Sequence, residues 1–107
     1  MESHTAVHLG HLLILGPFLF ALGAGYLTMI PSIAIAVIGV VIILYHAFRG
    51  YTKFAAGGNP WIYLIHALLV GPALIAYHFT DGRYVRELIM MLGFAAVGYH
   101  GYYLIAQ

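Results

Sequence analysis

Four uninterrupted apolar segments limit what this chain can fold into. They cover residues 7–27, 32–48, 61–79 and 84–106 approximately. A helix needs about 20 apolar residues to cross the hydrocarbon core of a bilayer, and these segments lack the two-residue alternation of membrane strands. Because 64% of the residues are hydrophobic and only 7% are charged, a soluble domain with a charged surface is excluded. The sequence therefore predicts one integral membrane domain over residues 1–107, an all-α, four-helix transmembrane bundle surrounded by the lipid bilayer.

An internal repeat divides this domain into two similar halves. The phrase HLLILGPFLFA recurs as HALLVGPALIA 55 positions later, with six of eleven positions identical. The pattern Gly-x5-Tyr-His then occurs at Gly39 and again at Gly93, 54 positions later. We predict two tandem helical hairpins, residues 7–51 and 61–105. Because each repeat contains an even number of spans, a pseudo-twofold axis along the membrane normal should relate them.

Each repeat carries one histidine early in its first span and one late in its second span. These four residues are His11, His46, His66 and His100. Following the chain back and forth places all four in the half of the membrane that holds the termini, about 5–11 Å from the midplane at 1.5 Å per residue. Gly39 and Gly93 precede two of them by two helical turns and allow close helix approach on the same face. This spacing favours histidine faces that point into the bundle.

Histidines inside apolar segments are costly unless they are paired, so they usually mark a function. The chain has no cysteine, and neutral imidazole is a ligand for copper, zinc and iron, including haem iron. The leading hypothesis is a haem or a transition-metal ion (Cu, Zn or Fe) bound by the four repeated histidines, for redox chemistry or metal handling. Tyr45 and Tyr99 directly precede two of these histidines and are expected to serve as hydrogen-bond partners.

Two other classes of function stay open. Histidine titrates near neutral pH, so the same residues suit a proton or ion channel, which would be a homo-oligomer. Alternatively, the histidines form hydrogen bonds that hold a structural membrane protein together without a cofactor. No Ser–His–Asp arrangement and no phosphate-binding loop is present, which favours a role other than catalysis.

Two Gly-Pro pairs, Gly16-Pro17 and Gly71-Pro72, form the other repeated feature. Proline removes one helical hydrogen bond and clashes with the preceding turn. Each pair should therefore kink its span near the middle and provide a hinge or a pocket.

The remaining histidines, His4, His8 and His78, have no histidine at the matching position of the other repeat. We expect them to be interfacial or solvated. His8 lies one turn before His11 and can share its helix face, but its counterpart in the second repeat is Tyr63.

The few charges give limited information about partners and orientation. The formal net charge is +1 and there is no basic cluster, so nucleic acid is not an expected partner. Four spans place both termini on one side of the membrane. Basic residues flank the spans equally on both sides, but those opposite the termini have acidic neighbours, which favours termini in the cytosol.

The stretch WIYLIH at 61–66, which leads into Gly71-Pro72, and the stretch MLGFAAVGYHGY at 91–102 resemble small four-span membrane proteins of large DNA viruses of algae and protists. The resemblance covers most of the chain. It implies an infected-cell or virion membrane as the setting, including a structural role in the virion or its assembly. It implies no particular activity.

Overall fold

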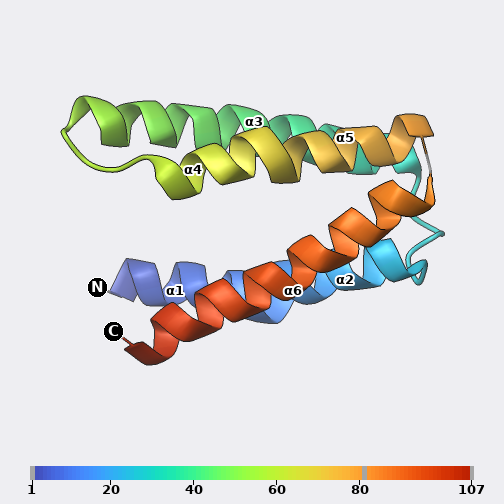
Figure 1. Ribbon diagram of the computed structural model, residues 1–107, viewed down its shortest axis with the longest axis horizontal. Coiled ribbons are helices and arrows are strands. Elements are labelled where there is room, and N and C mark those ends of the chain that lie inside the picture. Colours follow the sequence, from blue (N-terminus) through green and yellow to red (C-terminus); the bar gives the residue numbers. More distant parts are fainter. Residues whose placement is uncertain (1, 81, 107) are drawn as a thin grey trace. The chain divides into compact units, whose positions relative to one another are not determined.

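The structure is a computed structural model that describes residues 2–80 and 82–106, and this part of the chain consists of helices and short turns without a strand (Figure 1). Four helices in it are long and apolar enough to cross a membrane. They are Thr5–Ala24, Ser32–Ala55, Trp61–Thr80 and Arg83–Ala106. The predicted all-α class with four spans is confirmed, and the spans support a multi-pass membrane protein in contact with lipid.

The first and third spans are each divided into three helical segments, whereas the second and fourth are continuous. The first span contains α1 (Glu2–Gly10), the π-helical turn η1 (His11–Leu15) and α2 (Gly16–Ala24). The third contains α4 (Trp61–Ile65), the π-helical turn η2 (His66–Val70) and α5 (Gly71–Thr80). The second span is α3 (Ser32–Ala55), and the fourth is α6 (Arg83–Ala106).

Two helices end near glycines with positive φ angles, and both ends differ from those expected from the apolar pattern. Gly25 has φ 91° and ends α2 after Ala24, three residues before the expected end. The second span was expected to stop at Phe48, but α3 continues to Ala55, and Gly57 with φ 86° follows it. Polar residues are compatible with a helix that leaves the membrane, so a left-handed glycine, rather than polarity, ends this one.

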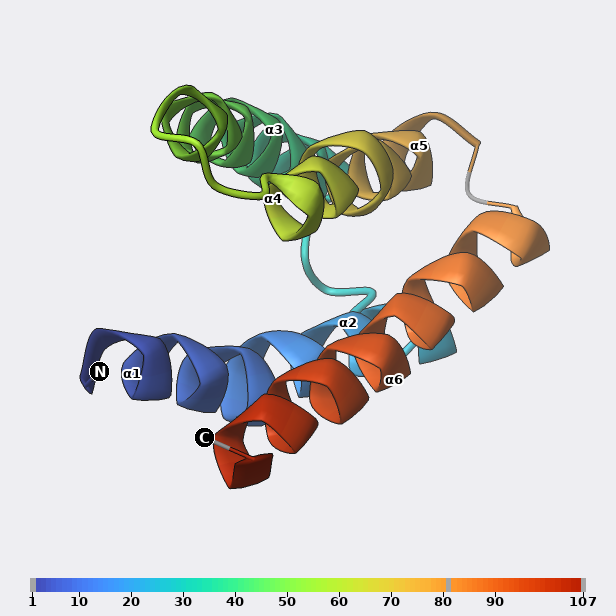
Figure 2. The same cartoon turned by 60° about the vertical axis from the view of Figure 1, so that its left-hand side comes forward.

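The chain forms two compact units that do not coincide with the sequence repeats. The terminal unit comprises Met1–Thr28 and Arg86–Gln107, and the central unit comprises Met29–Val85. In the terminal unit α2 lies beside α6, and in the central unit α3 lies beside α5 (Figures 1 and 2). Each repeat contributes one span to each unit, so the predicted hairpins over 7–51 and 61–105 stay a prediction, as does the single domain.

Each unit is built on a close approach between two glycines. A Cβ atom on Gly93 would lie 2.7 Å from the carbonyl oxygen of Gly16 in the terminal unit. A Cβ atom on Gly39 would lie 2.6 Å from the carbonyl oxygen of Gly71 in the central unit. Side chains at these positions would keep the backbones apart. The close approach expected at Gly39 and Gly93 is confirmed, and the opposing residue is in each case the glycine of a Gly-Pro pair.

The buried side chains of both units are mainly aliphatic. Leu19, Leu22 and Ile89 are buried in the terminal unit, and Ile35 and Leu74 are buried in the central unit. Most other large apolar side chains on the four spans are exposed, as expected for helices whose outer faces contact lipid.

Candidate metal-binding site

A repeated histidine begins each of the two π-helical turns. The N–H of Gly16 bonds to the carbonyl of His11, and the N–H of Gly71 bonds to the carbonyl of His66, five residues back in both cases. The prolines at positions 17 and 72 lack an N–H, so the widened turn is the local form that the helix takes before them. Single π-helical turns occur frequently at functional sites. The Gly-Pro pairs therefore set the backbone around these histidines, and their proposed action as hinges stays a prediction.

His11, His46 and His66 each bond to the backbone of their own helix through Nδ1. The Nδ1 atoms of His11 and His46 lie 2.8 Å from the carbonyl oxygens of Val7 and Ile42. His66 repeats the arrangement, with its Nδ1 atom 2.7 Å from the carbonyl oxygen four residues earlier. A carbonyl oxygen only accepts, so Nδ1 carries the proton and donates it, and Nε2 carries the lone pair. This is the arrangement in which a histidine presents Nε2 to a metal ion.

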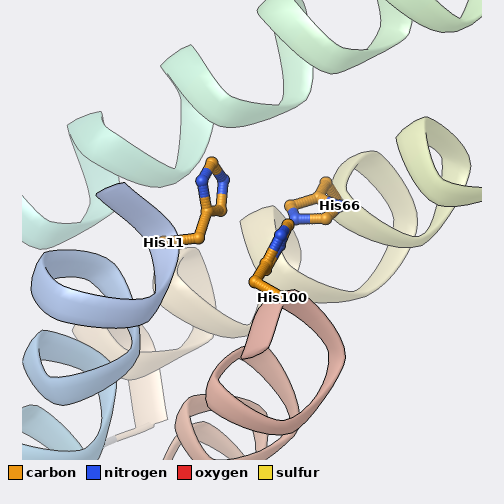
Figure 3. Close-up of side chains that lie close together, drawn as sticks. All are labelled: His11, His66 and His100. Carbon is orange, nitrogen blue, oxygen red and sulfur yellow. The ribbon is translucent and has the colours of Figure 1, made fainter. Parts of the chain in front are cut away.

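The four repeated histidines form two pairs, one in each unit. In the central unit the rings of His46 and His66 are stacked, with centroids 4.6 Å apart and planes 12° apart. In the terminal unit the ring centroids of His11 and His100 are 4.3 Å apart. Figure 3 shows these two side chains extending from η1 and α6; it also draws His66, which comes from the central unit. Each pair joins the first span of one repeat to the second span of the other.

The terminal unit adds a histidine that the repeat pattern did not select. The Nδ1 atoms of His8 and His100 lie 2.8 Å apart, and their ring centroids lie 5.0 Å apart. One nitrogen therefore donates to the other. His8 therefore has a protein partner, and the expectation that it is interfacial or solvated stays a prediction. The sequence signal for its role was present, because His8 and His11 are three residues apart on one helix face.

The two tyrosines expected as hydrogen-bond partners lie beside the histidines that they precede. The ring of Tyr45 meets the ring of His46 edge-on at 5.1 Å, and Tyr99 meets His100 in the same way at 5.1 Å. The hydroxyl of Tyr45 accepts a hydrogen bond of 3.3 Å from Arg49. Hydrogen bonding from these tyrosines to the histidines stays a prediction.

The two remaining histidines lie outside these pairs. Nδ1 of His78 is 2.8 Å from the hydroxyl oxygen of Ser32, at the opposite end of the central unit from His46 and His66. The side chain of His4 lies outside the described residues.

No family model, curated protein or solved structure matches the chain. The chemistry of the site therefore has to be argued from its own residues. Four repeated histidines, as two pairs of close imidazole rings, supply neutral nitrogen donors within apolar helices. A single site that uses all four ligands would draw on both units, and it stays a prediction.

Proposed function

We propose that this multi-pass membrane protein binds a transition-metal ion through pairs of histidines inside its spans, for redox chemistry or metal handling. The observation that carries the proposal is the common geometry of His11, His46 and His66. Each donates Nδ1–H to a carbonyl of its own helix, which fixes the ring and assigns the lone pair to Nε2. Each also has a second imidazole ring within 4.6 Å or less, centroid to centroid.

The spacing of the rings favours a metal ion over haem. Two imidazoles on opposite sides of a haem iron place their ring centroids about 6 Å apart, since each iron–nitrogen bond is about 2.0 Å. A tetrahedral ion with bonds of about 2.0–2.1 Å needs centroids only about 5 Å apart. The 4.3 Å between the tilted rings of His11 and His100 is closer to the second arrangement. The stacked rings of His46 and His66 would have to turn before they could bind one ion, since a bound ion lies in the plane of each ring. Nitrogen ligands without thiolates suit zinc, copper and iron ions.

Elemental analysis and an absorption spectrum test this proposal. The protein would be produced with zinc, copper, iron and haem supplied and then purified in mild detergent. We expect bound metal that is reduced in His100→Ala and unchanged in the control His78→Ala, which lies outside both pairs. Haem would give a Soret band instead. Protein that contains neither metal nor haem would refute binding.

The contact between His8 and His100 favours a proton channel as the second candidate. Two ring nitrogens 2.8 Å apart can pass a proton from one to the other. A channel predicts proton flux into liposomes that falls in His100→Ala. Flux equal to that of empty liposomes would exclude this candidate.

A structural role in a virion membrane is the third candidate, which the resemblance to small viral membrane proteins suggests. It predicts neither metal nor flux. Removal of a paired histidine would then lower thermal stability without changing any bound ligand.

A further inference from the structure

In the terminal unit the rings of His8, His11 and His100 lie close together, whereas the corresponding cluster of the central unit is the pair His46 and His66. His100 is buried, and the rings of His8 and His11 lie 5.0 and 4.3 Å from its ring, centroid to centroid. One ring nitrogen of His11 and one of His100 lie within 4.8 Å of each other. Two rings of the first span, His8 and His11, thus lie beside the ring of His100.

The Nδ1 atoms of His8 and His100 are compatible with a shared metal ion. His8 and His11 are three residues apart, so they occupy neighbouring positions on one face of the first span. The 2.8 Å between the Nδ1 atoms of His8 and His100 is the length of an N–H···N bond. Two nitrogens on one tetrahedral ion lie about 3.3 Å apart, given bonds of 2.0–2.1 Å. An ion can therefore replace the shared proton if the two rings separate by about 0.5 Å.

The central unit has a different residue at the corresponding position. Tyr63 is the repeat counterpart of His8, and its ring centroid lies 6.3 Å from that of His46. The guanidinium of Arg49 lies over the Tyr63 ring, 5.7 Å from its centroid. A neutral phenol is a poor ligand for a divalent ion compared with imidazole, since its oxygen must lose a proton to bind well. The two units are therefore unequal as metal sites.

We propose that His8, His11 and His100 form a three-histidine site for a divalent transition-metal ion, and that it binds metal more tightly than His46 and His66 do. This inference rests on the proposed metal-binding function and adds to it the location of the main site. Three protein ligands leave one position of a tetrahedral ion for water or an exchangeable ligand. Such an open position is typical of ions that react or are passed on, whereas structural ions are fully enclosed by protein ligands.

Exchanging the two counterpart residues tests this asymmetry. His8→Tyr gives the terminal unit the residue of the central unit, and Tyr63→His does the reverse. Zn²⁺ binding to metal-free protein in detergent would be measured by calorimetry, and Co²⁺ spectra would report the coordination geometry. We expect one tight site in the unaltered protein. Since loss of an outer-shell partner alone costs 10–100-fold, His8→Tyr should weaken that site by about 100-fold or more. Tyr63→His should add a second tight site.

The outcomes separate this inference from the proposed function. Unaltered protein that binds no Zn²⁺ or Co²⁺ would overturn both. Protein that binds Zn²⁺ equally tightly with and without His8→Tyr would overturn the three-histidine site alone. Tyr63→His keeps the test valid even if His8→Tyr misfolds, because it adds a ligand rather than removing one. If Tyr63→His still binds only one ion tightly, the asymmetry is wrong.

Discussion

Replacing Gly93 with alanine should separate the two helices of the terminal unit. The added Cβ atom would lie 2.7 Å from the carbonyl oxygen of Gly16 and 2.7 Å from the backbone nitrogen of Phe20. Both neighbours are backbone atoms, so they cannot move aside by rotating a side chain. Ordinary contact begins at 3.4 Å, and the helices must therefore separate by about 0.7 Å at this point.

The cost of this separation can be estimated from contacts that the two helices lose. A gap of about 0.5–1 Å removes a quarter to a half of the dispersion energy of each affected contact. Overpacking of this kind typically costs about 1–3 kcal/mol. We therefore expect Gly93→Ala to lower the free energy of unfolding by about 1–3 kcal/mol, or about 5- to 150-fold in the equilibrium constant. Because His100 lies two turns further along the same face, Zn²⁺ affinity should fall as well.

Gly98→Ala is the matched control for this prediction. It makes the same substitution on α6, but its Cβ atom would have no neighbour within 4 Å. Unfolding of both variants would be followed by circular dichroism while a denaturing detergent is titrated into mild-detergent micelles. Gly98→Ala should be as stable as the unaltered protein or slightly more stable, since alanine favours helix. Equal stability of the two variants would refute the role assigned to the glycine contact.

Three further predictions concern the central unit and the imidazole protons. Pro72→Ala restores a backbone donor, so η2 should convert to α-helix. The conversion should turn His66 by about 100° relative to α5 and weaken Zn²⁺ binding. Backbone NMR shifts would show the conversion, and unchanged π-helical shifts would contradict it. Nitrogen-15 NMR of metal-free protein should find the ring proton of His46 and His66 on Nδ1, and protons on Nε2 would contradict the assigned ligand atom. Ser32→Ala should cost about 1 kcal/mol through loss of its bond to His78, and unchanged unfolding would contradict that bond.

The sequence was sufficient to predict the four spans because their length and apolarity depend on local residues alone. It was less informative about where the spans end. Gly25 and Gly57 adopt positive φ angles, and a single glycine does not indicate by itself whether it will end a helix or lie within one. The continuation of α3 past Phe48 depends on this choice. The predicted end of the second span at Phe48 was therefore wrong, because it was placed by residue polarity whereas backbone conformation determines where α3 ends.

The candidate site was predictable in its residues but not in its pairings. The repeat identified the four histidines, and the two-turn spacing from Gly39 to His46 correctly indicated a close helix contact. Which spans pair is a non-local property, and the compact units join spans from different repeats. The contact of His8 with His100 was not predicted, because the repeat comparison gave weight only to positions where both copies carry histidine. A substitution between copies can mark a functional difference, which a search for identity passes over.

The choice between a ligand site and purely structural hydrogen bonding depends on where the imidazole N–H groups are directed. An imidazole N–H contributes to helix association only when it is directed across the interface, because a bond within one helix adds nothing to association. His46 and His66 donate Nδ1–H to carbonyls of their own helices, and the carbonyl that His66 uses, Ile62, already accepts the backbone N–H of His66. Such bonds restrict the ring at a cost in side-chain entropy. They also define Nε2 as the basic nitrogen, which is the arrangement of a metal-binding histidine and the reason for proposing a ligand site.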